Sequence, residues 1–275
     1  MKNDRVSQLL NMAYSTESPA RSEAIARQIL EISPDNPEAL VILADCTEDT
    51  AEREDILTRA LKYADDEELV FSVNFRLAHT FFENNKFTES LNACESAMKA
   101  ADDPDDEDSV KPLYYRVLIE LHEWQKILAL TLRDETHGLA WGYSRLVAAW
   151  MTGGSRALCA SMFWDALILA PDVPFYMFGY YPEPDDDEDH DDFDFAVMYY
   201  DIDSVSEDFE QWIMRGTILF GLLTNRFDGR EREYVLGVLD ALGGYEEYEK
   251  MSGILLEADD ESVIEALAAN KCLSD

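Results

Sequence analysis

The sequence predicts an all-α protein, built as an array of helical hairpins followed by an acidic loop and additional C-terminal helices. Apolar residues recur at helical spacing along most of the chain, and no stretch keeps the alternation of a strand for more than a few residues. Glycine and proline fall between these segments, where they end one helix and begin the next. With 275 residues and 47% apolar composition, the chain can bury roughly three quarters of its unfolded surface, so we expect it to fold.

The apolar periodicity predicts the elements in order. Before the acidic stretch we expect helices near 4–14, 19–32, 37–46, 50–63, 67–84, 87–100, 109–121, 123–133, 137–152 and 155–169. After it we expect helices near 194–201, 206–223, 229–242, 245–257 and 259–270. The chain is thus expected to have helical repeats over 1–171, an aromatic-flanked acidic loop over 172–194, and a C-terminal helical portion over 195–275 that packs on the repeats.

Residues 140–171 carry a regular pattern of large and small side chains. Its positions are Tyr143, Leu146, Val147, Trp150, Gly154, Cys159, Phe163, Ala166 and Pro171. Small residues let the second helix of a pair approach the first, aromatic residues fill the space between them, and the proline ends the pair. An earlier copy contains Leu77, Ala78, Phe81, Asn85, Phe87, Ser90, Cys94 and Ala97, with the polar Asn74 where a large residue is usual. A copy shortened at its turn contains Leu40, Leu43, Ala44 and Ala60.

These spacings resemble tetratricopeptide repeats over residues 20–171. The segments ALVILADC, HGLAWGYSRLVAAW and ALILAPDVPFYMFGYYPEP together are similar to uncharacterised bacterial relatives of the suppression-of-tumorigenicity-seven family. The resemblance implies an α-solenoid and no established catalytic activity. The cysteine-rich zinc-binding tail of some relatives does not carry over, because this chain ends ALAANKCLSD with only Cys272. The alternative is a helical bundle whose alanine and aromatic positions coincide with the pattern by chance.

The charge of the chain restricts its partners. The sequence has 58 Asp and Glu against 22 Lys and Arg, a formal net charge of −36. Direct binding to nucleic-acid phosphate or to an anionic membrane is therefore unfavourable. An acidic inhibitor that mimics nucleic acid in a basic cleft remains an alternative function. The N-terminal segment has no apolar core of signal-peptide length, and we expect a cytoplasmic protein.

Chemistry-bearing patterns are scarce. The four cysteines form no CxxC pair and stand near no histidine at metal-ligand spacing, so we expect reduced core residues. His122 and Glu123 lack the second histidine of HExxH, and neither GxSxG nor a phosphate-binding glycine loop occurs. We therefore expect no enzyme activity, no cofactor and no metal site, with an uncharacterised metal-binding protein or enzyme as the least favoured alternative.

The stretch PEPDDDEDHDDFD, residues 182–194, is the most acidic part of the chain. It does not fit a calcium-binding EF-hand loop, because no register places a glycine sixth and a glutamate twelfth. Like charges at this density favour a solvated loop. The aromatic residues beside it, among them Phe178, Tyr180 and Tyr181, allow two interpretations: they form core between the repeats and the C-terminal helices, or they form a partly exposed patch that docks a basic, apolar peptide.

A repeat array also predicts a concave surface lined by the first helix of each pair. On that surface we expect Phe75, His79 and Phe82, with Ser144, Ala148 and Met151 from the later repeat and Arg116 and Glu120 between them. Lysine and asparagine residues of the kind that capture a C-terminal carboxylate are missing at these positions, so the expected ligand is basic or apolar. The sequence thus predicts a non-catalytic protein-interaction module, unless the C-terminal helices of the chain itself cover this surface.

Overall fold

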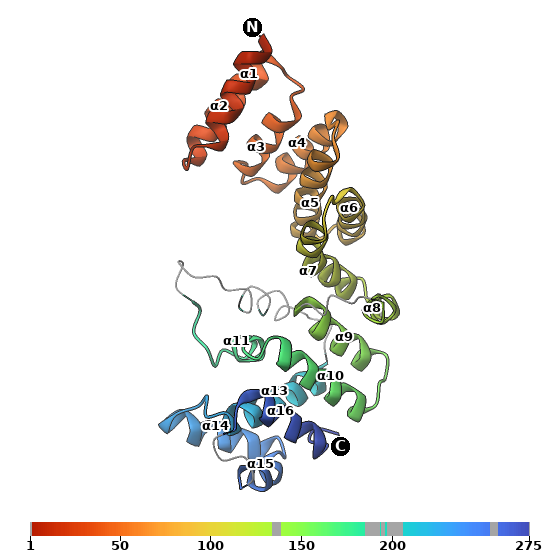
Figure 1. Cartoon of the computed structure of the whole chain (residues 1–275), viewed down its shortest axis with the longest axis vertical. Helices are drawn as coiled ribbons and strands as arrows, with labels where there is room; N and C mark the ends of the chain where they lie inside the picture. The colour runs from red at the N-terminus through yellow and green to blue at the C-terminus, as the bar shows by residue number, and fades with distance from the viewer. Residues whose placement is uncertain are drawn as a thin grey trace. The chain divides into compact units, whose positions relative to one another are not determined.

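The computed structural model describes residues 2–133, 139–184, 193, 196, 206–253 and 258–274, and these residues form helices and no strands (Figure 1). The all-α prediction is therefore confirmed for the described chain. The fold divides into two compact units, Met1–Val117 and Leu118–Asp275. The expected division at residues 171 and 194 was based on repeat ends and stays a prediction.

The first unit consists of consecutive helices that contact one another in chain order. They are α1 (Lys2–Tyr14), α2 (Pro19–Ile32), α3 (Pro37–Asp45), α4 (Thr50–Tyr63), α5 (Glu67–Glu83), α6 (Phe87–Ala100) and the larger part of α7 (Pro104–Glu120). Each helix contacts the next from α1 to α6, and α1 also contacts α3. This arrangement buries one side of α5 and of α6, whereas α3 is covered on all sides, with Ala39–Ala44 buried.

Side-chain caps decide where several of these helices begin. Asn36, Asp49 and Asp66 each accept a hydrogen bond from the backbone N–H three residues later, at 2.8, 2.8 and 2.7 Å. These bonds satisfy N–H groups that have no partner inside the helix. Pro19 and Pro37 stand at the first positions of α2 and α3, where a missing N–H costs nothing.

Small buried side chains hold the helices of the first unit close together. Ala26, Ala39, Ala44, Ala60, Ala78 and Ala97 have no exposed surface. Two buried polar side chains beside them are satisfied locally: Asn74 donates to the Val70 carbonyl at 2.8 Å, and Ser90 donates to the Ala78 carbonyl at 2.7 Å. A polar residue at position 74 is therefore compatible with the core, although the repeat pattern expects a large one.

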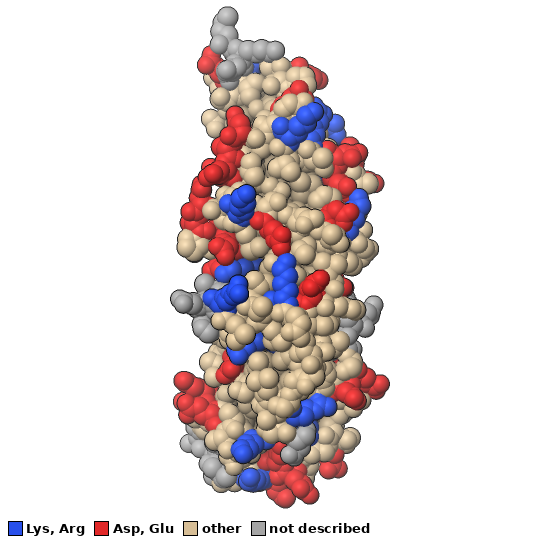
Figure 2. Space-filling view, turned by 90° about the vertical axis from the view of Figure 1, so that its right-hand side faces the viewer, with Lys and Arg blue, Asp and Glu red and all other residues tan. Residues whose placement is uncertain are grey.

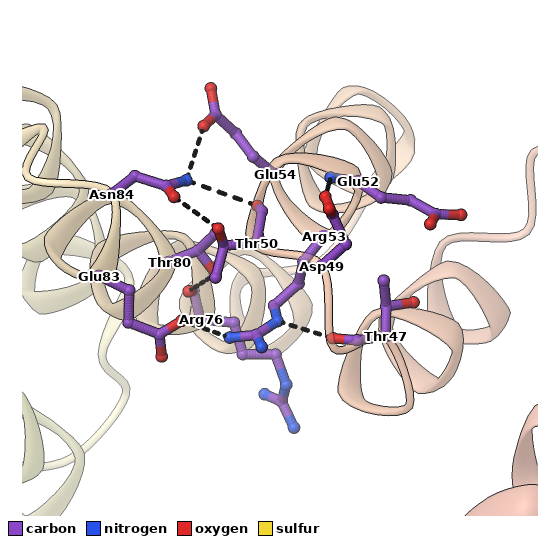
Figure 3. A network of polar contacts seen from close by, with 10 residues as sticks. All are labelled: Thr47, Asp49, Thr50, Glu52, Arg53, Glu54, Arg76, Thr80, Glu83 and Asn84. Carbon is purple, nitrogen blue, oxygen red and sulfur yellow. Dashed lines mark hydrogen bonds and ion pairs between the residues drawn. The ribbon is translucent and has the colours of Figure 1, made fainter.

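A polar network surrounds the start of α4 (Figure 3). The Thr50 hydroxyl donates to the Asn84 side-chain oxygen at 2.6 Å, and the Asn84 amide donates to Glu54 at 3.3 Å. Arg53 donates to the Thr47 carbonyl at 3.1 Å and to Glu83 at 2.8 Å. The start of α4 is thereby joined to the end of α5.

The second unit has a larger core rich in aromatic residues. Its helices are α8 (Trp124–Thr131), α9 (Leu139–Met151), α10 (Arg156–Leu169), α11 (Val173–Met177), α13 (Glu207–Leu223), α14 (Gly229–Ala241), α15 (Tyr245–Ser252) and α16 (Asp260–Ala269). Phe163, Phe175 and Phe220 are fully buried at the centre. The Trp212 indole donates to the Leu273 carbonyl at 3.1 Å, which attaches the C-terminal segment to α13.

The structure differs from the predicted elements at three places. Helix α7 begins at Pro104 instead of near 109, because Asp103 caps it and acidic side chains fill its first turn, where the helix dipole favours them. Helix α11 lies inside the predicted loop over 172–194, because Phe175 is fully buried and holds this turn against the core. Helix α15 ends at Ser252. The expected helix near 194–201 and the acidic residues 185–192 lie outside the described residues.

Gly221 on α13 lies directly against two aromatic rings of the second core. An added Cβ would lie 2.5 Å from Phe227 and 2.7 Å from Phe175. We expect Gly221→Ala to lower the free energy of unfolding by about 1–3 kcal/mol through overpacking. Denaturant unfolding followed by tryptophan fluorescence measures this, since all five tryptophans lie in the second unit.

Gly237→Ala is the matched control for Gly221→Ala. Gly237 also lies inside a helix, but an added Cβ there would meet no atom within 4 Å. We expect this change to raise the free energy of unfolding by up to about 1 kcal/mol, because alanine favours the helix more than glycine does. Equal effects of the two substitutions would contradict the packing described here.

Candidate functional site

One side of α5 carries a row of aromatic rings. Phe71, Phe75 and His79 follow one another at intervals of four residues, which places them on the same face of the helix. The centroids of Phe71 and Phe75 are 6.0 Å apart with nearly parallel planes, and those of Phe75 and His79 are 4.8 Å apart at an angle of 82°. The phenyl rings are half-buried and His79 is exposed, so the row is open to a partner.

Phe82 extends this row toward α7. Its ring lies 5.5 Å from Phe87, and the guanidinium carbon of Arg116 lies 5.8 Å from its centroid. Arg116 itself is buried, with 6% of its surface exposed. The structure therefore brings four predicted residues, Phe75, His79, Phe82 and Arg116, to one region of the first unit. We call Phe71, Phe75, His79 and Phe82 the aromatic row.

The imidazole of His79 is suited to apolar contact. The surrounding protein shields it from part of the solvent although its outer edge is exposed, and this partial burial lowers its pKa from the ordinary value. The carboxylate of Glu83 acts in the opposite direction and is the smaller effect. His79 is consequently neutral at pH 7 and presents a flat, uncharged ring beside Phe75.

An ion pair borders the aromatic row on the side of α3. The guanidinium of Arg76 donates to both carboxylate oxygens of Asp45 at 2.7 and 3.0 Å, and also to the Ser72 hydroxyl at 2.8 Å. The pairing is bidentate, which orients the arginine strongly. Arg76 is therefore occupied by groups of its own chain.

Asp45 of this ion pair belongs to a group of carboxylates that we call the acidic surface: Glu38, Asp45, Asp65, Asp66 and Glu68. Partial burial raises the pKa of Glu38, and the charges of Asp66, Asp65 and Glu68 raise it further. The pKa of Tyr14 is also raised, first by partial burial and then by acidic neighbours that include Glu38, whereas Arg76 lowers it. The residues therefore affect one another across α1, α3 and α5.

A hollow of about 480 Å³ opens next to Glu38. It is bounded by α1, by the end of α2 and by the start of α3, and its lining residues are Val6, Ser7, Leu10, Ile32, Ser33, Asn36 and Glu38. Polar atoms make up most of the lining, while Val6, Leu10 and Ile32 supply aliphatic surface. Its volume falls within the range of about 300–1,000 Å³ that is usual for ligand pockets.

The remaining predicted residues, Met151, Phe178, Tyr180 and Tyr181, lie in the second unit and pack against its core. Burial raises the pKa of Tyr180 to about 12. Ser144 and Ala148, expected beside Met151 on an open surface, are fully buried. The reason is that both α8 and α10 pack on α9, which leaves little of this helix free.

Arg226 holds the aromatic segment around α11 in place. Its guanidinium donates to Tyr181 at 2.8 Å and to Asp260 at 2.6 Å, forms an ion pair with Asp172, and lies 5.2 Å from the centroid of Phe175. Phe175 and Tyr181 are stacked with centroids 5.0 Å apart. These contacts favour the structural interpretation of the aromatic residues that precede the acidic stretch.

Possible metal ligands and the cysteine thiols were compared across the described part of the chain. Within it, no three His, Cys, Asp or Glu side chains lie close enough together to hold a metal ion. The described cysteines are free thiols, three of them buried, and burial raises the pKa of Cys94 to about 12. The acidic stretch around His190, which was tested against calcium geometry, lies mostly outside the described residues.

Comparisons with protein-family models, with curated proteins and with solved structures found no match. Among the helices that the structure describes, none has the length and apolar character needed to cross a membrane.

Sequence reasoning did not find the acidic surface or the hollow. Arg76 directly follows the predicted Phe75, and its pairing with Asp45 joins positions 31 residues apart. Glu38 follows a proline at the start of a helix and looks like an ordinary first-turn acid. A helical-wheel comparison of α3 with α5 could have indicated the pairing, but the neighbours of Glu38 depend on how the helices stack.

The role of Arg226 can be tested by substitution. We expect Arg226→Met to lower the free energy of unfolding of the second unit by about 1–3 kcal/mol, because three hydrogen-bonded partners lose their donor while the half-exposed carboxylates regain water. Arg230→Met removes the same charge from an exposed position and should change stability by less than about 0.5 kcal/mol. Tryptophan fluorescence during urea unfolding compares the two variants.

The raised pKa of Glu38 predicts a pH-dependent stability difference. An acid with a raised pKa in the fold disfavours folding when ionised, and this penalty disappears as the pH falls through the folded pKa. Glu38→Gln should therefore raise Tm at pH 7 by about 1–3 °C, and the difference should shrink toward pH 4. Circular dichroism melting reports the helices of both units, and tryptophan fluorescence, which reports the second unit alone, identifies the part of the transition that belongs to the first unit.

Glu52→Gln is the control for Glu38→Gln, because Glu52 is an exposed acid in the first turn of the neighbouring helix α4. Its removal should leave Tm unchanged or lower it slightly, since only the favourable interaction with the helix dipole is lost. A decrease in Tm for both variants would show that the neighbours of Glu38 do not destabilise its charge.

Proposed function

We propose that this chain is a non-catalytic interaction module of the cytoplasm, in which a tetratricopeptide-like array binds a protein segment that carries basic and apolar side chains. The observation that carries the proposal is the aromatic row of α5 lying next to the acidic surface. One part of this face offers apolar contact and the adjoining part offers negative charge. The free thiols of the chain suit a reducing compartment.

The aromatic row provides the apolar half of the proposed contact. Aromatic side chains contribute disproportionately to protein interfaces, because they bury a large area with few rotatable bonds. Phe71 and Phe75 are already supported by ring contacts along the helix, so little conformational freedom would be lost when a partner covers them.

The acidic surface provides the polar half. Residues 1–117 contain 25 Asp and Glu against 12 Lys and Arg, so the whole first unit attracts basic partners. Figure 2 shows one face of the molecule, on which acidic and basic side chains lie next to one another between broad tan areas. Several of the basic side chains are held in ion pairs of the chain itself, such as Arg53 with Glu83 and Lys86 with Glu54.

The same face is poorly suited to an acidic ligand. Arg76 is paired with Asp45, and Arg116 is buried against Phe82. Neither guanidinium can donate hydrogen bonds to the C-terminal carboxylate of a peptide without giving up its present contacts. Charge complementarity therefore selects for Lys and Arg in the partner and against Asp and Glu.

A selection experiment tests this function with the full chain as bait. Random 12-residue peptides displayed on phage are selected at low salt, and the recovered sequences should be enriched in Lys or Arg together with Phe, Leu or Ile. The best peptide is then synthesised with a fluorescent label, and its Kd is measured by anisotropy. Phe75→Ala should weaken binding by about fivefold or more, the loss of a buried aromatic anchor.

Tyr234→Ala is the control, because Tyr234 is a 68% exposed aromatic residue of α14 in the second unit. Its removal should leave the Kd unchanged. Recovery of acidic peptides, or equal weakening by both substitutions, would exclude the aromatic row as the binding surface. Displacement of the chain from basic proteins by DNA, with no peptide enriched, would favour nucleic-acid mimicry instead.

A further inference from the structure

The hollow beside Glu38 combines aliphatic and polar lining residues. Val6 and Leu10 of α1 and Ile32 at the end of α2 supply aliphatic surface, and Ser33, Asn36 and Glu38 supply polar atoms. Leu10 is buried, whereas the other residues just named are partly exposed. The hollow is therefore accessible to a partner.

Glu38 is the charged group of this hollow and lacks a cation. Across the described residues, no lysine or arginine forms an ion pair with it, although the chain pairs Arg76 with Asp45 close by. A half-buried carboxylate with acidic neighbours is unfavourable unless a positive charge compensates it. The fold therefore maintains negative charge at a place where removing that charge would help stability.

We propose that the hollow accepts one lysine or arginine side chain of the protein segment that binds the aromatic row, with the cationic head on Glu38 and the aliphatic stem along Val6, Leu10 and Ile32. This inference rests on the proposed function, since it names a specificity pocket for the same partner. Long basic side chains commonly bury their stems on apolar surface while a polar group holds the charged end. The two kinds of lining match the two parts of such a side chain.

The charge of Glu68 relates the hollow to the aromatic row. Glu38 lines the hollow and responds electrostatically to Glu68 on α5. Glu68 lies on the same side of α5 as Phe75, seven residues or about two turns away. A segment of a few extended residues could thus place one basic side chain in the hollow and apolar side chains on the row.

Other ligands fit the hollow less well. A divalent cation requires several oxygen ligands, and Glu38 is the sole carboxylate among the residues that line the hollow in the described chain. Phosphate or another anion would be repelled by the acidic surface. A single monovalent side chain satisfies the charge of Glu38 without demanding further ligands.

The first arm of the test uses a minimal probe that does not depend on the aromatic row. N-acetyl-lysine amide is titrated into the isotope-labelled full chain, and backbone chemical shifts are followed by NMR. Shifts at Ser33, Asn36 and Glu38 are expected. They should be absent with N-acetyl-norleucine amide, lost in Glu38→Gln, and retained in Glu52→Gln.

The second arm uses the selected peptide and a double-mutant cycle. Each lysine of the peptide is replaced by norleucine, which keeps the aliphatic stem and removes the charge. At one position the replacement should weaken binding by about tenfold to the wild-type chain, the effect of losing a charged hydrogen bond. The same replacement should have no further effect in Glu38→Gln, while it keeps its full effect in Glu52→Gln.

The two arms separate the failure of this inference from failure of the proposed function. A peptide that binds through Phe75 but shows no lysine coupled to Glu38 overturns the pocket and leaves the interaction module intact. Lysine amide that shifts the lining residues while no peptide depends on Phe75 supports a cation pocket and overturns the module. Because Glu38→Gln is expected to be more stable than the wild-type chain, its loss of binding cannot be attributed to unfolding.

Discussion

Close approach between neighbouring helices is the constraint on which the fold depends. Fully buried alanines recur through the first unit, and in the second unit Gly142 lies so near α10 that an added Cβ would be 3.2 Å from the Cβ of Ala166. At such distances the backbones of two helices exclude solvent without large side chains between them. Large residues such as Leu57 and Phe163 are fully buried in the remaining space of the two cores.

This packing determines which side of α5 is available for recognition. Val73, Leu77 and Ala78 are buried against neighbouring helices, so the opposite side, with Phe75 and His79, keeps access to solvent. Helix α5 thus carries apolar side chains on both its buried and its accessible side. Its buried side contributes to folding, while its accessible aromatic row contributes surface that a monomer would be expected to cover or to use.

Arg226 in the second unit and Glu38 in the first unit differ in how their charges are compensated. Arg226 in the second unit receives acidic and aromatic partners from several segments, so its charge is compensated within the fold. In the first unit Glu38 stands among acids, and no described cation compensates it. An uncompensated charge in a hollow is the kind of local cost that proteins retain at binding sites, because a partner supplies the missing interaction.

The sequence by itself determined the helical class and most helix boundaries, and it placed Phe75, His79 and Phe82 on one helix, because apolar periodicity, capping residues and residue spacing are local properties. It did not indicate Phe71, which the structure adds to the aromatic row. The burial of Ser144 and Ala148, the anchoring of Tyr181 by Arg226 and the hollow beside Glu38 were decided only by the tertiary structure. Each depends on which helices become neighbours. A residue pattern along one helix specifies the face that it offers, but the charge and space opposite that face come from segments that are distant in sequence.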